Sequence, residues 1–138
     1  MTRLTPFLAL TAAGGALFLI AAQQPSALSG SKIGQWELSA ESGATPPTRE
    51  CIADMLELAR VEHRGKTCSV KIISDGPGSA VVQYSCGAAG FGRTQIDVIT
   101  PRSLRISTQG ISDSLPFNYV LQARRIGDCG QQAFVTRH

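Results

Sequence analysis

Residues 68–86 read CSVKIISDGPGSAVVQYSC, two β-rich runs around a cluster of turn residues. Val, Ile and Tyr favour strands and the intervening Asp-Gly-Pro-Gly favours a turn, so the segment predicts a β-hairpin. Folding it symmetrically about Pro77 gives three opposed pairs: Ile72 with Val82, Val70 with Tyr84, and Cys68 with Cys86. Because opposed residues share one face of a sheet, this register gathers four apolar residues and both cysteines on the same side.

More strands follow and precede this hairpin. After the glycine-rich link 87–92, two alternating runs flank a turn at Pro101, which predicts a second hairpin with Ile96 opposite Ile106 and Val98 opposite Leu104. A further strand is expected over 117–123, and an early one over 34–40. The aromatic residues of these runs all face inward by alternation: Trp36, Tyr84, Phe117 and Tyr119. They predict a packed core, or alternatively the lining of an apolar ligand site.

One helix is predicted between the early strand and the first hairpin. Thr48 is a possible cap for a helix from Arg49 to Glu62, and Ile52, Met55, Leu56 and Ala59 form an apolar stripe at helical spacing. The fold class is therefore mainly β (α+β): about six strands in a twisted antiparallel sheet or half-barrel, with one helix between the first two strands.

The N-terminus has the three parts of a secretory signal. A short basic start (Met1-Thr2-Arg3) precedes an apolar run over 6–22, and small and polar residues follow. We expect 1–27 to be a signal peptide or N-terminal anchor, 28–33 a linker, 34–129 a single disulfide-stabilised domain and 130–138 a tail. Cleavage after Ala22 and cleavage after Ala27 both remain open. The expected location is periplasmic or secreted, or the inner membrane if the signal is not cleaved.

Four cysteines in a small exported chain favour a disulfide framework. The hairpin register pairs Cys68 with Cys86 and leaves Cys51 for Cys129. Three connectivities are possible, and the register is the only reason for choosing this one. A zinc site or free thiols are the alternatives, but structural zinc normally uses closely spaced cysteine pairs, and none occurs here.

The order of these motifs resembles a bacterial exported family, domain-of-unknown-function family 3617. The similarity rests on the Gly34-x-Trp36-Glu37 start, the four cysteines and the ending Arg124-Arg125-Ile126-Gly127-Asp128-Cys129. It covers about Gly34 to Cys129. The resemblance implies a periplasmic or secreted β-rich domain of unassigned role, and it supplies no catalytic residues. The loop 42–47 is shorter than the Met- and Pro-rich loop that family members often carry.

The residues predict a binding protein rather than an enzyme. His63 is expected to be exposed near a helix end, and no nucleophile–base pair, metal set or cofactor motif is present. The formal net charge of +3 is spread along the chain, which disfavours nucleic acid as a partner. Five arginines could form a basic patch, although a solvated sheet face is the simpler interpretation: Arg93, Arg102, Arg105, Arg124 and Arg125.

We therefore expect a non-enzymatic domain that binds an unknown envelope protein or a small ligand. It would contact a membrane only through an uncleaved N-terminal segment. A ligand binder should contain a continuous apolar cavity between sheet and helix, and a filled core would contradict that expectation. The alternative is an inhibitor of an extracytoplasmic hydrolase, which should present a rigid exposed loop at 42–47 or 87–92. That alternative rests on analogy between folds.

Overall fold

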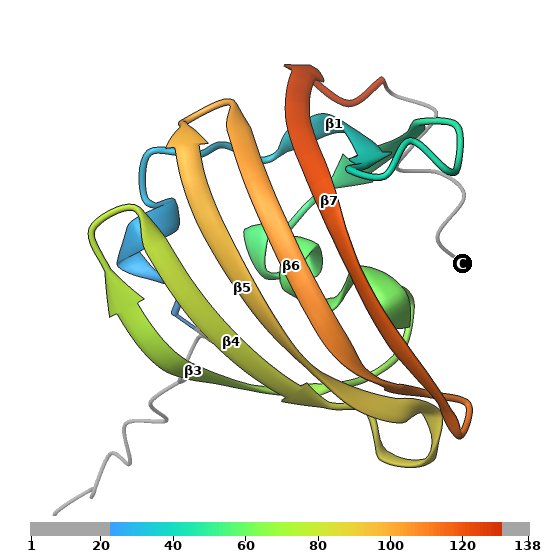
Figure 1. Cartoon of the computed structure of the whole chain (residues 1–138). Helices are drawn as coiled ribbons and strands as arrows, with labels where there is room; N and C mark the ends of the chain where they lie inside the picture. Colours follow the sequence, from blue (N-terminus) through green and yellow to red (C-terminus); the bar gives the residue numbers. More distant parts are fainter. Residues whose placement is uncertain (1–22, 131–138) are drawn as a thin grey trace, which may run out of the picture.

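The computed structural model describes residues 23–130, which form one seven-stranded antiparallel sheet (Figure 1). The strand order is β2-β1-β7-β6-β5-β4-β3. The strands are β1 (Gly34–Ala40), β2 (Thr48–Ile52), β3 (Ser69–Gly76), β4 (Ser79–Ser85), β5 (Gly90–Thr100), β6 (Ser103–Ser112) and β7 (Leu115–Gly127). The expected signal or anchor up to residue 22 and the expected tail from residue 131 lie outside the described residues.

Both predicted hairpins are confirmed in their register. Strands β3 and β4 pair Val70 with Tyr84 and Ile72 with Val82. Strands β5 and β6 pair Ile96 with Ile106 and Val98 with Leu104. Short turns and alternating apolar residues fix these pairings locally, because a shift by one residue would move every apolar side chain to the other face.

The predicted helix over 49–62 is wrong in its first part. Residues Thr48–Ile52 form strand β2, in which Thr48 pairs with Leu38 of β1 instead of capping a helix. A 3₁₀ helix, η2 (Met55–His63), begins only after Asp54, whose carboxylate accepts from the Leu56 N–H at 2.9 Å. Glu57 completes this capping box. The sheet therefore has seven strands rather than six, and the helix follows the second strand instead of the first.

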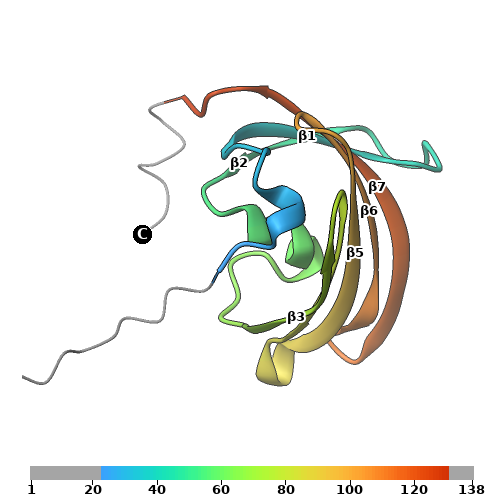
Figure 2. The same ribbon diagram turned by 90° about the vertical axis from the view of Figure 1, so that its left-hand side faces the viewer.

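The sheet curls around a helical layer on its concave side (Figure 2). That layer consists of η2 and the short 3₁₀ helix η1 (Ser26–Leu28), and η2 packs against β5 and β6. A third 3₁₀ turn, η3 (Gly87–Ala89), joins β4 to β5. The residues that fill the space between sheet and helices include Leu28, Trp36, Ile52, Met55, Leu58, Ile96, Leu104 and Ile106. A buried hydrogen bond also joins the two layers, since the Thr94 hydroxyl of β5 donates to the Ala59 carbonyl of η2 at 2.5 Å.

The segment expected to be a linker, 28–33, is packed onto the domain at its N-terminal end. Leu28 is 0% exposed and belongs to the core, and Ser31 is also buried. The Trp36 indole Nε1–H donates to the Lys32 carbonyl at 3.1 Å, which holds the segment beside β1.

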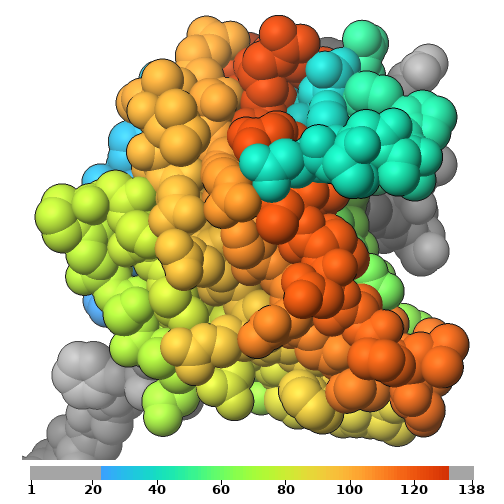
Figure 3. All heavy atoms as spheres, viewed as in Figure 1, coloured from blue at the N-terminus to red at the C-terminus, as the bar shows by residue number. Residues whose placement is uncertain are grey.

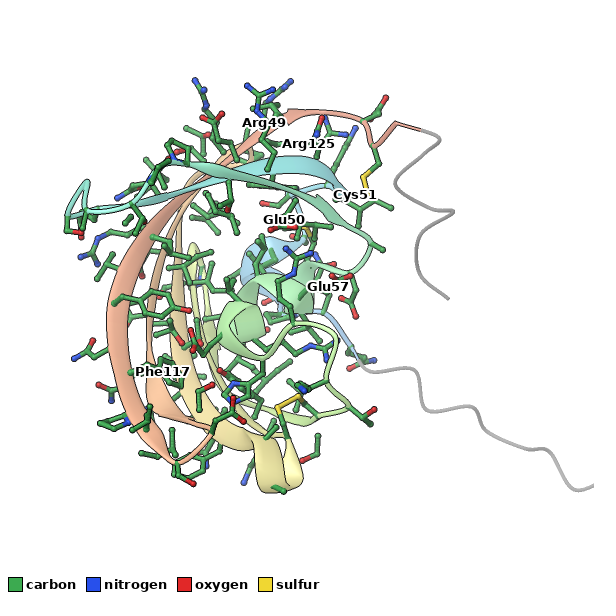
Figure 4. All side chains as sticks on the ribbon, turned by 90° about the vertical axis from the view of Figure 1, so that its right-hand side faces the viewer. Arg49, Glu50, Cys51, Glu57, Phe117 and Arg125 are labelled. Carbon is green, nitrogen blue, oxygen red and sulfur yellow. A yellow bond between two sulfur atoms is a disulfide. The ribbon has the colours of Figure 1, made fainter. Side chains whose placement is uncertain are left out.

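Two disulfides join the four cysteines in the predicted pairs. Cys68 and Cys86 connect the ends of the first hairpin, with Cα atoms 4.1 Å apart. Cys51 and Cys129 connect β2 to the residues after β7, with Cα atoms 5.6 Å apart (Figure 4). Such bonds form and persist in oxidising, extracytoplasmic compartments. Over residues 23–130, no helix has the length and apolar character needed to cross a bilayer.

Candidate functional site

The central space between the sheet and η2 contains side chains rather than a ligand cavity. Trp36, Leu58, Ile96, Leu104 and Ile106 are all fully buried there. The apolar cavity expected for a ligand binder between sheet and helix is therefore not found in the described domain, which rules out the expected ligand site in the central core. Open space on the concave side is found instead near its rim, beside β1 and β7.

An aromatic cluster of His63, Tyr84 and Phe117 closes one region of the concave side. The rings of Tyr84 and Phe117 meet the His63 ring edge-on, with centroids 5.4 and 5.9 Å away. Phe117 reaches this cluster from β7 (Figure 4). The sheet backbone makes room for it, because a Cβ at Gly92 would lie 2.5 Å from the Tyr84 hydroxyl oxygen.

His63 is buried, so the predicted exposed histidine is wrong. The residue is 3% exposed, with Nε2 3.0 Å from the Ala89 carbonyl and Nδ1 3.1 Å from the Tyr84 hydroxyl. Because a carbonyl can only accept, Nε2 carries a hydrogen and donates to Ala89, while Nδ1 shares a second hydrogen bond with the Tyr84 hydroxyl. Burial also raises the pKa of the Tyr84 phenol. Both ring nitrogens therefore form hydrogen bonds within the protein. This arrangement fits a structural role better than acid–base chemistry on a substrate.

A groove of about 390 Å³ lies beside the aromatic cluster and opens at the rim of the sheet. We call it the β1–β2 groove. Its walls come from β1, the loop 41–47, the start of β2, η2 and β7, and they are lined by Leu38, Ala40, Ser42, Ala44, Thr45, Pro46, Thr48, Val61, Tyr119 and Leu121. Most of this lining is apolar, with a few hydroxyl groups at the edge. This combination is typical of sites that hold the apolar body of a small ligand and orient it with a few hydrogen bonds.

Tyr119 forms the boundary between the groove and the aromatic cluster. Its ring lies 5.9 Å from that of Phe117, and its hydroxyl donates to a Glu62 carboxylate oxygen at 2.9 Å. Burial, and then the hydrogen bond and charge of Glu62, raise the pKa of Tyr119. The phenol therefore remains protonated at neutral pH, and it holds its hydrogen bond to Glu62 while the residue lines the groove.

The loop 41–47 is exposed and projects beyond the sheet (Figure 2). In the space-filling view it lies against β7 (Figure 3). Two contacts hold its base: the Glu41 N–H donates to the Val120 carbonyl at 2.9 Å, and the Glu41 carboxylate pairs with Arg105 at 3.1 Å. The other expected loop, 87–92, consists of η3 and the first residues of β5; Gly90 and Gly92 are buried there, whereas Gly87, Ala88 and Phe91 are exposed. The loop 41–47 fits an inhibitory loop better, because all of its residues are exposed and none of them belongs to a helix or strand.

The arginines do not gather into one free basic patch. Arg105 pairs with Glu41, Arg124 with Glu37 at 3.2 Å, and Arg125 with Asp128 at 2.6 Å. Glu37 also accepts from Arg49, so β1, β2 and β7 are linked by charge on the outer face. Exposed pairs of this kind contribute little to stability, but they neutralise charges that an anionic partner would need.

Metal ligands are not gathered anywhere in residues 23–130, where no three His, Cys, Asp or Glu side chains adopt a metal-binding arrangement. No family model and no curated protein matches the chain. The resemblance to family 3617 therefore stays a prediction. The groove itself could not be found from the sequence, because its walls come from segments up to about eighty residues apart. The only sequence signal was the inward alternation of Tyr119 and Leu121.

Proposed function

We propose that this protein is an exported, non-enzymatic binding domain of the bacterial cell envelope, and that its ligand site is the β1–β2 groove. The observation that carries the proposal is the groove itself, an open and largely apolar space of about 390 Å³ beside a filled core. That size lies within the range of small-molecule sites, roughly 300–1,000 Å³. The disulfide pattern supports the expected location in the periplasm or outside the cell.

The ligand class follows from the lining. Leu38, Leu121 and the methyl groups of Val61 would contact an acyl or aryl body, and burying that surface would supply most of the affinity. The Tyr119 oxygen and the hydroxyl groups of Ser42 and Thr45 would orient one polar group. An uncharged or weakly polar amphiphile fits this arrangement better than a polyanion does.

A fluorescent apolar probe, N-phenyl-1-naphthylamine, tests the site directly. Ala40→Phe would fill the groove from β1, and we expect it to weaken probe binding by about tenfold or more. Ser39→Phe is the matched control, because Ser39 is the adjacent residue and alternation places its side chain on the other face of the sheet. Equal probe affinity in both variants, with unchanged melting temperatures, would remove the groove as the site.

Inhibition of an extracytoplasmic hydrolase is the second candidate, and the projecting loop 41–47 is the observation that favours it. A rigid loop that occupies the active site of an enzyme would inhibit it at one-to-one stoichiometry. Pro46 and Pro47 would keep this loop rigid. Titration of the protein against muramidases and serine proteases tests this. Inhibition that is unchanged by Pro46→Gly and Pro47→Gly would show that the loop is not the inhibitory element.

A further inference from the structure

Residues 23–31 are a structural part of the domain. Pro25 and Leu28 are fully buried, and η1 packs against β3 and β4 on the concave side (Figure 2). Leu28 belongs to the same core as Trp36 and Leu58. The segment thus covers apolar surface that the sheet and η2 leave open near β3.

Backbone hydrogen bonds hold this segment in place. The N–H groups of Ser26 and Ala27 donate to the Asp75 carboxylate at 2.7 and 3.0 Å. The Leu28 N–H donates to the Pro25 carbonyl at 3.0 Å, and the Gln24 side chain donates to the Leu28 carbonyl at 2.6 Å. The bonds from Ala27 and Ser26 lower the pKa of Asp75, as donors to a carboxylate do.

The two cleavage positions left open by the sequence have different consequences for these contacts. Cleavage after Ala27 would remove Pro25 from its buried position, remove both N–H donors of Asp75 and place a charged amine on Leu28. Cleavage after Ala22 would keep every one of these contacts, since the residues that make them, 24–28 and Asp75, all remain in the product. If the signal is cleaved during export, only the product that starts at Gln23 retains all of these contacts.

We propose that export removes residues 1–22 by cleavage between Ala22 and Gln23, and that residues 23–31 remain as the N-terminal segment that completes the core. This inference rests on the proposed export of the protein and does not depend on the ligand of the groove. A membrane-bound signal peptidase would hydrolyse the Ala22–Gln23 amide. One water is consumed, Ala22 gains a carboxylate and Gln23 gains a free amine.

The first test is the intact mass of the full-length chain after export in a bacterial host. We expect the protein recovered from the envelope to have the mass of residues 23–138 with two disulfides, allowing for cyclisation of Gln23. Ala22→Phe should abolish this processing, because small residues are needed at the exit of the signal, whereas the matched variant Ala27→Phe should leave it unchanged. A product starting at Leu28, or a chain that keeps residues 1–22, would overturn the proposal.

The second test compares the stability of chains that start at Gln23 and at Leu28. We expect the shorter chain to melt at least about 5 °C lower, because it lacks Pro25 and the donors of Asp75. Asp75→Ala should lower the melting temperature of the longer chain and have no effect in the shorter one. Equal melting temperatures would contradict the structural role of residues 23–27. Probe binding to the longer chain tests the groove separately, so failure of either proposal can be recognised.

Discussion

The aromatic cluster and the β1–β2 groove are neighbours on the concave side of one sheet, but they are built differently. In the cluster, both nitrogens of His63 have partners and the rings pack against glycine backbone. In the groove, Tyr119 and Leu121 of the same strand β7 face a space of about 390 Å³. A buried polar group with all its partners is a structural feature, whereas unfilled apolar surface at a rim is where a ligand can bind.

The largest expected difference between filled core and groove concerns two residues of η2. Leu58 is fully buried, whereas Val61 is half-buried and forms part of the groove wall. Leu58→Ala should lower the free energy of unfolding by about 2–5 kcal/mol, because it leaves a cavity in packed surroundings. Val61→Ala should cost about 1 kcal/mol or less, since solvent already reaches the groove. Urea denaturation measures both, and equal losses would mean that the groove is part of the core.

The same comparison explains which features the sequence could predict. The two hairpins were predicted with their register because turn residues and alternation act over short distances. Strand β2 was mistaken for helix because Ile52, Met55, Leu56 and Ala59 are all buried and fit a helical stripe. Their division between a strand and η2 depends on the pairing of β2 with β1, which is a tertiary interaction.

The functional features were harder to predict because they, too, depend on tertiary contacts between distant segments. The burial of His63 depends on sheet curvature, which brings Tyr84 and the Ala89 carbonyl to a ring that no local pattern marks as internal. The disulfide pairs were predictable, because the hairpin register fixed Cys68 with Cys86 and only two cysteines remained. The groove needs β1, η2 and β7 together, and no local segment contains that information.

A smaller effect distinguishes the two tyrosines of these regions. Tyr84→Phe removes the hydrogen-bond partner of His63 Nδ1, leaves a buried nitrogen without a hydrogen bond and should cost about 1–3 kcal/mol. Tyr119→Phe is the matched change, and it removes only a bond to the exposed Glu62, for about 1 kcal/mol or less. The order of the two variants should be reversed for binding of the probe. Tyr119→Phe changes the polar edge of the groove and should alter probe affinity, whereas Tyr84→Phe should not. If the two variants lose similar stability and bind the probe alike, the cluster and the groove are not functionally distinct regions.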